Sequence, residues 1–102
     1  MKPYYKKSSL QPVTVEQRSD DELLIRYLVP PESMYYASGI NYEESAGNIR
    51  VVMDRCAINA GCVTMIKRPT PLPADRMAQV ILPYTGGKVT VVYIDGEEQV
   101  FP

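Results

Sequence analysis

The sequence predicts a single all-β domain, an antiparallel β-sandwich of seven to eight short strands. Three observations predict this fold class. Apolar and polar residues alternate with period two over most of the chain, turn-forming residues interrupt the alternation about every ten residues, and no segment has the apolar spacing of a convincing helix. Alternate residues of a strand point to opposite faces of a sheet, so each run can bury one face. A small β-barrel is the alternative architecture.

The chain has 102 residues, which is the length of one domain. Residues 1–9 are polar and show no apolar period, so we expect them to form a flexible tail. This segment also lacks the apolar stretch that forms the centre of a signal peptide. We therefore expect one β-sandwich domain to span residues 10–102.

The apolar face of each main run can be assigned from its alternation. In chain order these faces hold Val13 and Val15; Leu23, Ile25, Tyr27 and Val29; Ile49, Val51 and Met53; and Val89, Val91 and Tyr93. Pro30-Pro31 ends the second run, because proline cannot donate to a strand ladder. Gly-containing turns at 45–48 and 85–87 precede the last two runs.

Asp95-Gly96 is the strongest turn signal in the chain, because both residues accept the positive φ angles of a type I′ hairpin. In that register Ile94 pairs with Glu97, and Val91 pairs with Val100. A hairpin at the end of the chain can lie at a sheet edge. Its open backbone groups could then support a homodimer formed through an edge strand.

The segment 69–73, Pro-Thr-Pro-Leu-Pro, is predicted to be an extended connector that carries the chain from one sheet to the other. The predicted fold is immunoglobulin-like in architecture only. The chain has no Trp, and its two cysteines are too close in sequence to bridge two sheets.

Cys56 and Cys62 are separated by five residues, not by the two residues of thioredoxin-like redox sites or zinc ribbons. We expect a disulfide that closes a hairpin, with Met53 opposite Met65 and Val52 opposite Ile66. Two reduced buried thiols or a redox-active pair are the alternatives. A structural disulfide implies an oxidising compartment. We therefore expect a periplasmic or secreted protein, for example a bacterial envelope lipoprotein, whose signal has been removed.

The composition excludes several classes of chemistry. The chain has no His, so imidazole-based nucleophilic catalysis and His-containing zinc sites are excluded, and two cysteines are too few for a zinc site built from four thiolates. No glycine-rich phosphate loop is present, and we predict no metal and no cofactor. The net charge of −1 removes the attraction that drives nucleic-acid binding. No apolar run reaches the roughly 20 residues of a transmembrane segment.

The stretch 34–42 concentrates Tyr, Met, Ser, Gly and Asn, the composition that protein-binding loops favour. Tyrosine offers a large contact area and a hydroxyl group at a low cost in entropy. We predict that Tyr35, Tyr36, Asn41 and Tyr42 contact a partner. The alternative is an ordinary strand with half-buried tyrosines.

The leading functional hypothesis is a non-enzymatic binding module that contacts a protein partner. A carbohydrate-binding module is the second hypothesis, since β-sandwiches can present aromatic side chains to sugars, although the lack of Trp weakens it. A small hydrolase that uses carboxylates is the third. Its candidate residues are the acidic groups at 20–22, 43–44 and 97–98, which we otherwise expect to be turns that face water.

Overall fold

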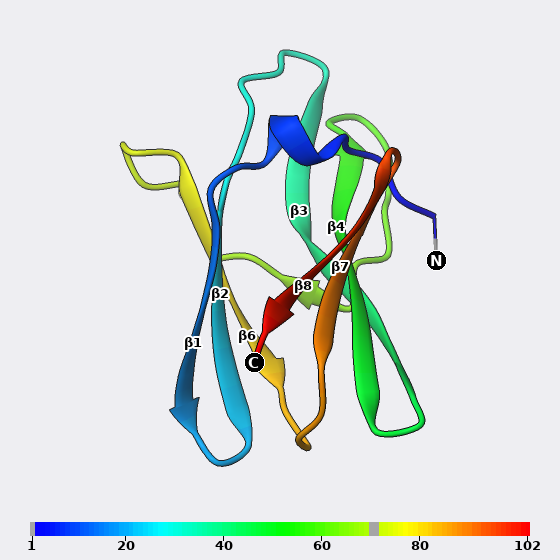
Figure 1. Cartoon of the computed structure of the whole chain (residues 1–102). Helices are drawn as coiled ribbons and strands as arrows, with labels where there is room; N and C mark the ends of the chain where they lie inside the picture. Colours follow the sequence, from blue (N-terminus) through cyan, green and yellow to red (C-terminus); the bar gives the residue numbers. More distant parts are fainter. Residues whose placement is uncertain (1, 70–71) are drawn as a thin grey trace.

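The structure is a computed structural model that describes residues 2–69 and 72–102. It contains two sheets packed face to face (Figure 1). The three-stranded sheet has the order β1 (Val13–Ser19), β2 (Glu22–Leu28) and β6 (Met77–Pro83). The five-stranded sheet has the order β5 (Ile66–Lys67), β3 (Tyr35–Ser45), β4 (Asn48–Ala57), β7 (Val89–Tyr93) and β8 (Gly96–Phe101). The predicted β-sandwich is confirmed, and the sheets do not close into a barrel.

All strand pairs are antiparallel except β4 and β7, which run parallel with Ile49 opposite Val89. A parallel pair needs a long crossover, and here the chain leaves the five-stranded sheet after β5, forms β6 in the other sheet and then returns as β7. The predicted connector between sheets therefore lies where the chain crosses. Residues 70–71 of that connector lie outside the described residues.

The core is formed by the apolar faces that the alternation predicts. Its inward residues include Leu23, Ile25, Tyr27, Val29, Ile49, Val51, Met53, Val89, Val91 and Tyr93, all buried. Val13 and Val15 of the edge strand β1 are partly buried and pack against this core. Burial of one face of each strand supplies the main apolar driving force for joining the two sheets.

Part of the segment predicted to be a flexible tail packs against the sandwich. Tyr5 is buried in the core cluster, and its carbonyl oxygen accepts a hydrogen bond from the Ile94 amide at 2.9 Å. A short 3-10 helix, η1 (Lys7–Ser9), follows. The Lys7 amide donates to Asp95 Oδ1 at 3.0 Å, and its ammonium group pairs with Glu98. This segment therefore lies against the turn between β7 and β8.

The turn between β7 and β8 differs from its predicted register. Tyr93 pairs with Gly96 and Val91 with Glu98, so the chain turns at Ile94-Asp95, one position earlier than expected. Type I′ geometry occurs instead between β3 and β4, where Ala46 and Gly47 have φ angles of 52° and 80°. The hairpin still places β8 at a sheet edge, as predicted.

Strand β3 contains a bulge at Ser38, between the pairs that Ala37 and Gly39 form with β4. The bulge lets β5 approach closely, and a Cβ atom at Gly39 would overlap the carbonyl oxygen of Ile66. The predicted hairpin that pairs Val52 with Ile66 is wrong, because Ile66 pairs with Ile40 of β3. After β4 the chain crosses the outer face of β3 and β4 and adds to the far side of β3.

Candidate functional site

The predicted disulfide between Cys56 and Cys62 is confirmed, with a Cα–Cα distance of 6.0 Å. It closes a loop of residues 57–61 at the end of β4, but it does not join two paired strands. Cys56 is buried on the outer face of β4 and Cys62 is half-buried above it. The disulfide thus fixes the start of the segment that crosses the outside of the five-stranded sheet.

Three polar side chains hold the rest of this crossing segment. Thr64 Oγ1 donates to Asp54 Oδ2 at 2.6 Å, and Ser38 Oγ lies 2.8 Å from Thr64 Oγ1 and 3.3 Å from the same carboxylate oxygen. All three residues are buried. The alternation of β4 places Asp54 on the face opposite the core, but the crossing segment covers it. Asp54 therefore accepts hydrogen bonds from side chains instead of facing water.

One end of the sandwich collects most of the exposed apolar side chains. Loops 29–34 and 58–65, the N-terminal segment and the turn at 94–95 meet at this end, at the top of Figure 1. Among the described residues, six of the eight exposed large apolar side chains lie here: Tyr4, Met34, Tyr35, Tyr36, Ile58 and Ile94. We call these six residues the tyrosine end. The other two, Val63 and Met65, belong to the segment that crosses the outer face of the sheet, where the Met65 sulfur accepts from the Tyr42 amide.

The tyrosine end is organised around Arg55. Its guanidinium donates to Glu32 Oε2 from Nε at 2.9 Å and from a terminal nitrogen at 2.5 Å. The same guanidinium lies over the ring of Tyr35, 3.9 Å from the ring centre. The hydrogen bonds to Glu32 raise the pKa of Arg55, so the cation persists. Arg55 therefore holds both the β2–β3 loop and the Tyr35 ring in place.

A hollow of about 300 Å³ adjoins this group on the N-terminal side. Tyr4, Tyr5 and Ile94 line it together with Glu32 and Arg55. The Tyr5 hydroxyl is buried and has no hydrogen-bond partner among the described residues. Burial, reinforced by the charge of Glu32, raises the pKa of this phenol, so it stays protonated.

A second hollow of about 190 Å³ lies on the other side of β3. Tyr36, Cys62 and Thr64 line it, as do Lys67 and Arg68 of the segment that continues from β5. Arg68 Nε donates to the Ala37 carbonyl oxygen at 2.5 Å, which ties this segment to β3. The backbone amide of Ile58 donates to the Met34 carbonyl oxygen at 3.0 Å, so the exposed side chains of the two loops are neighbours.

The structure separates the four residues predicted to contact a partner. Tyr35 and Tyr36 are each 40% exposed and lie at the tyrosine end. Tyr42 packs against the core on the inner face of β3. Asn41 Oδ1 accepts from the Met65 amide at 2.8 Å, so this side chain anchors the crossing segment. Tyr35 and Tyr36 are the first residues of β3, whereas Asn41 and Tyr42 lie beyond the Ser38 bulge, within the strand.

Sequence reasoning missed several residues of this site. Ile58 lies in the disulfide loop and Val63 directly follows Cys62, where no period assigns an apolar residue to a face. An apolar residue in a short polar loop was itself a signal of an exposed apolar side chain. Arg55 and Glu32 are far apart in the sequence, and nothing local predicts their ion pair.

The candidate carboxylates of the hydrolase hypothesis lie apart on different strands. Residues 20–22 occupy the β1–β2 turn and residues 43–44 lie near the β3–β4 turn, all exposed. In β8, Glu97 pairs with Arg50 and Glu98 with Lys7. Within residues 2–69 and 72–102, no group of three or more acidic or Cys side chains is arranged to hold a metal ion. The same residues include no helix long and apolar enough to cross a bilayer.

Comparison of the chain with protein-family models, with curated proteins and with solved structures finds no match in any of the three.

Proposed function

We propose that this chain is a non-enzymatic binding module of a bacterial envelope or secreted protein, and that its tyrosine end contacts a protein partner. The observation that carries the proposal is the gathering of exposed large apolar side chains at one end of the sandwich. Single exposed apolar residues are ordinary, but several of them gathered at one end of a domain indicate an interaction surface.

The composition of the surface supports a protein as the partner. The tyrosine end holds three tyrosines and a methionine, and it adjoins Arg55. These residue types are enriched at the centres of protein interfaces. Loops held by a rigid scaffold are the usual location of binding residues. Here the disulfide and the Arg55–Glu32 pair hold the loops, so binding would order few additional groups.

The disulfide in a small β domain is compatible with a location outside the cytoplasm. Periplasmic or secreted placement follows from the same proposal. It predicts that an alkylating reagent modifies neither cysteine when the purified chain is denatured without a reductant. Modification of both cysteines without prior reduction would contradict that placement.

The contact surface can be tested by photo-crosslinking in envelope extract. A photoreactive phenylalanine analogue at position 36 should give a discrete crosslinked protein, whereas the analogue at position 44, at the opposite end, should not. Met34→Ser with Ile58→Ser should abolish the crosslink, because the variant removes two apolar side chains of the proposed contact surface. These side chains are 68% and 64% exposed, so we expect the fold to tolerate the change. Glu43→Ala with Glu44→Ala is the matched control.

Tyr35→Ala with Tyr36→Ala should have the same effect as the Met34/Ile58 pair. Thermal unfolding separates a folding defect from a binding defect in this variant, since Tyr35 also packs on Arg55. A crosslink that is equally strong from positions 36 and 44, or that survives both double variants, would contradict the proposal.

The carbohydrate-binding alternative has less support from the geometry. Tyr35 and Tyr36 are consecutive in a strand and so point to opposite faces, and the Arg55 guanidinium already covers the Tyr35 ring at 3.9 Å. The two rings therefore do not form one flat platform for a sugar.

A further inference from the structure

The four edge strands of the sandwich differ in how they are protected against pairing with another chain. Edge strands are ordinarily blocked by charged residues, by bulges or by being short. Strand β1 carries Glu16 and Arg18 and has an irregular register between Gln17 and Ser19. Strand β8 carries Glu97 and Glu98 and has a bulge opposite Val89–Thr90. Strand β5 has only two residues.

Strand β6 has none of these features along its length. Its seven residues pair with β2 in an unbroken register from Met77 opposite Leu28 to Pro83 opposite Glu22. It contains no charged residue, and its one proline stands at its last position. The backbone hydrogen bonds of the described residues leave the side of β6 away from β2 without a strand partner.

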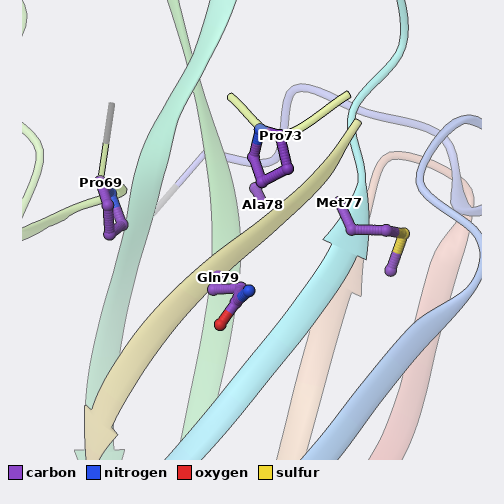
Figure 2. A pocket seen from close by; sticks show the side chains of 5 residues that line it. All are labelled: Pro69, Pro73, Met77, Ala78 and Gln79. Carbon is purple, nitrogen blue, oxygen red and sulfur yellow. The ribbon is translucent and has the colours of Figure 1, made fainter. Parts of the chain in front are cut away.

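The open side of β6 borders a groove. Two adjoining hollows of about 260 and 300 Å³ share Gln79 of β6 and Pro69 of the connector. Figure 2 shows side chains that line the first hollow, among them Pro69 of the connector and Gln79 of β6. Ile66 and Ile81 add apolar walls. The groove thus adjoins the side of β6 that has no strand partner among the described residues, and it offers apolar contacts at its sides.

The charges around the groove have one sign. Arg18 and Lys67 line it, and both are exposed and form no ion pair with any described residue. No acidic side chain is among the described residues that line it. Extended peptides that add to a sheet edge gain affinity from main-chain hydrogen bonds and specificity from side-chain contacts. The exposed cations favour a peptide with acidic residues.

We propose that the open edge of β6 binds an extended acidic peptide segment of a partner protein by strand addition. A second copy of this chain is a poorer occupant. Two β6 edges related by a two-fold axis would place the exposed Lys67 of each copy beside the same interface. The acidic strand β8 of a second copy has its Glu97 and Glu98 already paired with Arg50 and Lys7. This site is independent of the tyrosine end.

A defined peptide tests the proposal. The probe is a labelled peptide of seven alternating Val and Thr residues, the length of β6, flanked by Asp and Glu at both ends. Its binding to the full chain is measured by fluorescence anisotropy, and the site is mapped by amide NMR shifts. We expect shifts in residues 77–82 and binding at least about tenfold weaker for the same peptide flanked by Lys. Arg18→Glu with Lys67→Glu should reverse this preference.

Two sets of N-methylated peptides distinguish strand addition from contact through side chains. Alternate amides of an added strand point toward its neighbour, so methylation of one alternate set should abolish binding and methylation of the other should leave it nearly unchanged. Met34→Ser with Ile58→Ser should leave this binding unaltered, which separates it from the function proposed for the tyrosine end.

The proposal is overturned if the acidic peptide causes no shifts in residues 77–82, if both methylated sets weaken binding equally, or if the shifts fall on the tyrosine end. It is also overturned if sedimentation shows concentration-dependent self-association that protects the β6 amides from exchange. In that case the occupant is a second copy of the chain.

Discussion

The two ends of the sandwich are built on opposite principles. At the lower end of Figure 1 the β1–β2 turn, the β3–β4 turn and the loop 84–88 are joined by hydrogen bonds. The Tyr84 amide donates to the Asp21 carbonyl oxygen at 2.8 Å, and the Lys88 amide donates to Asn48 Oδ1 at 2.9 Å. We call this the turn end. None of the exposed large apolar side chains of the described residues lies there.

The tyrosine end reverses this pattern. Its apolar side chains are exposed, and one of its buried hydroxyl groups, that of Tyr5, has no hydrogen-bond partner within the described residues. A crosslink and an ion pair hold its loops in addition to backbone hydrogen bonds, whereas the loops of the turn end are held by the hydrogen bonds named above. The two ends therefore differ in how they treat apolar surface, because the tyrosine end exposes large apolar side chains and the described part of the turn end does not. The turns at the turn end join strands of fixed register.

The largest expected effect comes from removing the crosslink of the tyrosine end. Cys56→Ala with Cys62→Ala should lower the free energy of unfolding by about 2–3 kcal/mol, because the disulfide closes a small loop and Cys56 is buried. Urea unfolding measures the loss. Hydrogen exchange should show faster exchange in residues 58–65 and unchanged protection of the amides of Tyr84 and Lys88.

Reduced wild-type protein is the control for this variant, since it loses the bond and keeps both side chains. It should show the same local pattern with a slightly smaller loss. If protection falls equally at both ends, the disulfide supports the whole fold and the division between the ends does not hold.

The apolar faces of the strands could be predicted because alternation reports burial directly. Leu23, Ile25 and Tyr27 must face one layer whatever their neighbours are, so no tertiary information is needed. The disulfide could be predicted because only two cysteines exist and they are close in sequence. Half of the predicted contact residues, Tyr35 and Tyr36, are at the exposed end for a similarly local reason, their place at the start of a strand.

The features that local patterns miss depend on contacts distant in sequence. The period of β4 assigns Asp54 to water, but Thr64 and the crossing segment cover it. The pairing of β5 with β3 depends on the bulge at Ser38 and on the space beside Gly39. The earlier turn at Ile94-Asp95 is bounded by the N-terminal segment, whose Tyr5 carbonyl binds the Ile94 amide. Local propensity carries none of this information.

A matched pair of substitutions sharpens the comparison of the ends. Tyr84 Oη donates to the Gly87 carbonyl oxygen at 2.8 Å, so Tyr84→Phe should cost about 1 kcal/mol. The Tyr5 hydroxyl is buried close to Glu32 but forms no hydrogen bond of standard geometry with the described residues, so Tyr5→Phe should cost clearly less than Tyr84→Phe. Chemical denaturation of both variants measures the difference. Equal losses would show that the Tyr5 hydroxyl is also bonded in solution.

The Tyr5→Phe variant has a second measurable effect, on the stability of the fold at alkaline pH. The pKa of Tyr5 is raised in the folded protein by burial and by Glu32, whereas a tyrosine in the unfolded chain ionises near pH 10. The unfolded chain therefore loses a proton that the folded protein retains, and stability should fall as the pH rises above about 10. Tyr27, whose pKa is also raised by burial, contributes in the same direction. Tyr5→Phe should lose less stability than the wild type over this range.

The smallest effect is expected at the turn end, where one residue is strained. Ala46 has a φ of 52°, which is unfavourable for a residue with a Cβ atom, and Gly47 follows it at 80°. Asn-Gly is the preferred pair for a type I′ turn, and position 46 is exposed, so Ala46→Asn should stabilise the fold by about 0.5–1 kcal/mol. Ala46→Val, which is β-branched, should destabilise it, and urea unfolding compares the two. If Asn and Val have the same effect, this turn does not keep its left-handed geometry in solution, and the turn end is less rigid than its hydrogen bonds indicate.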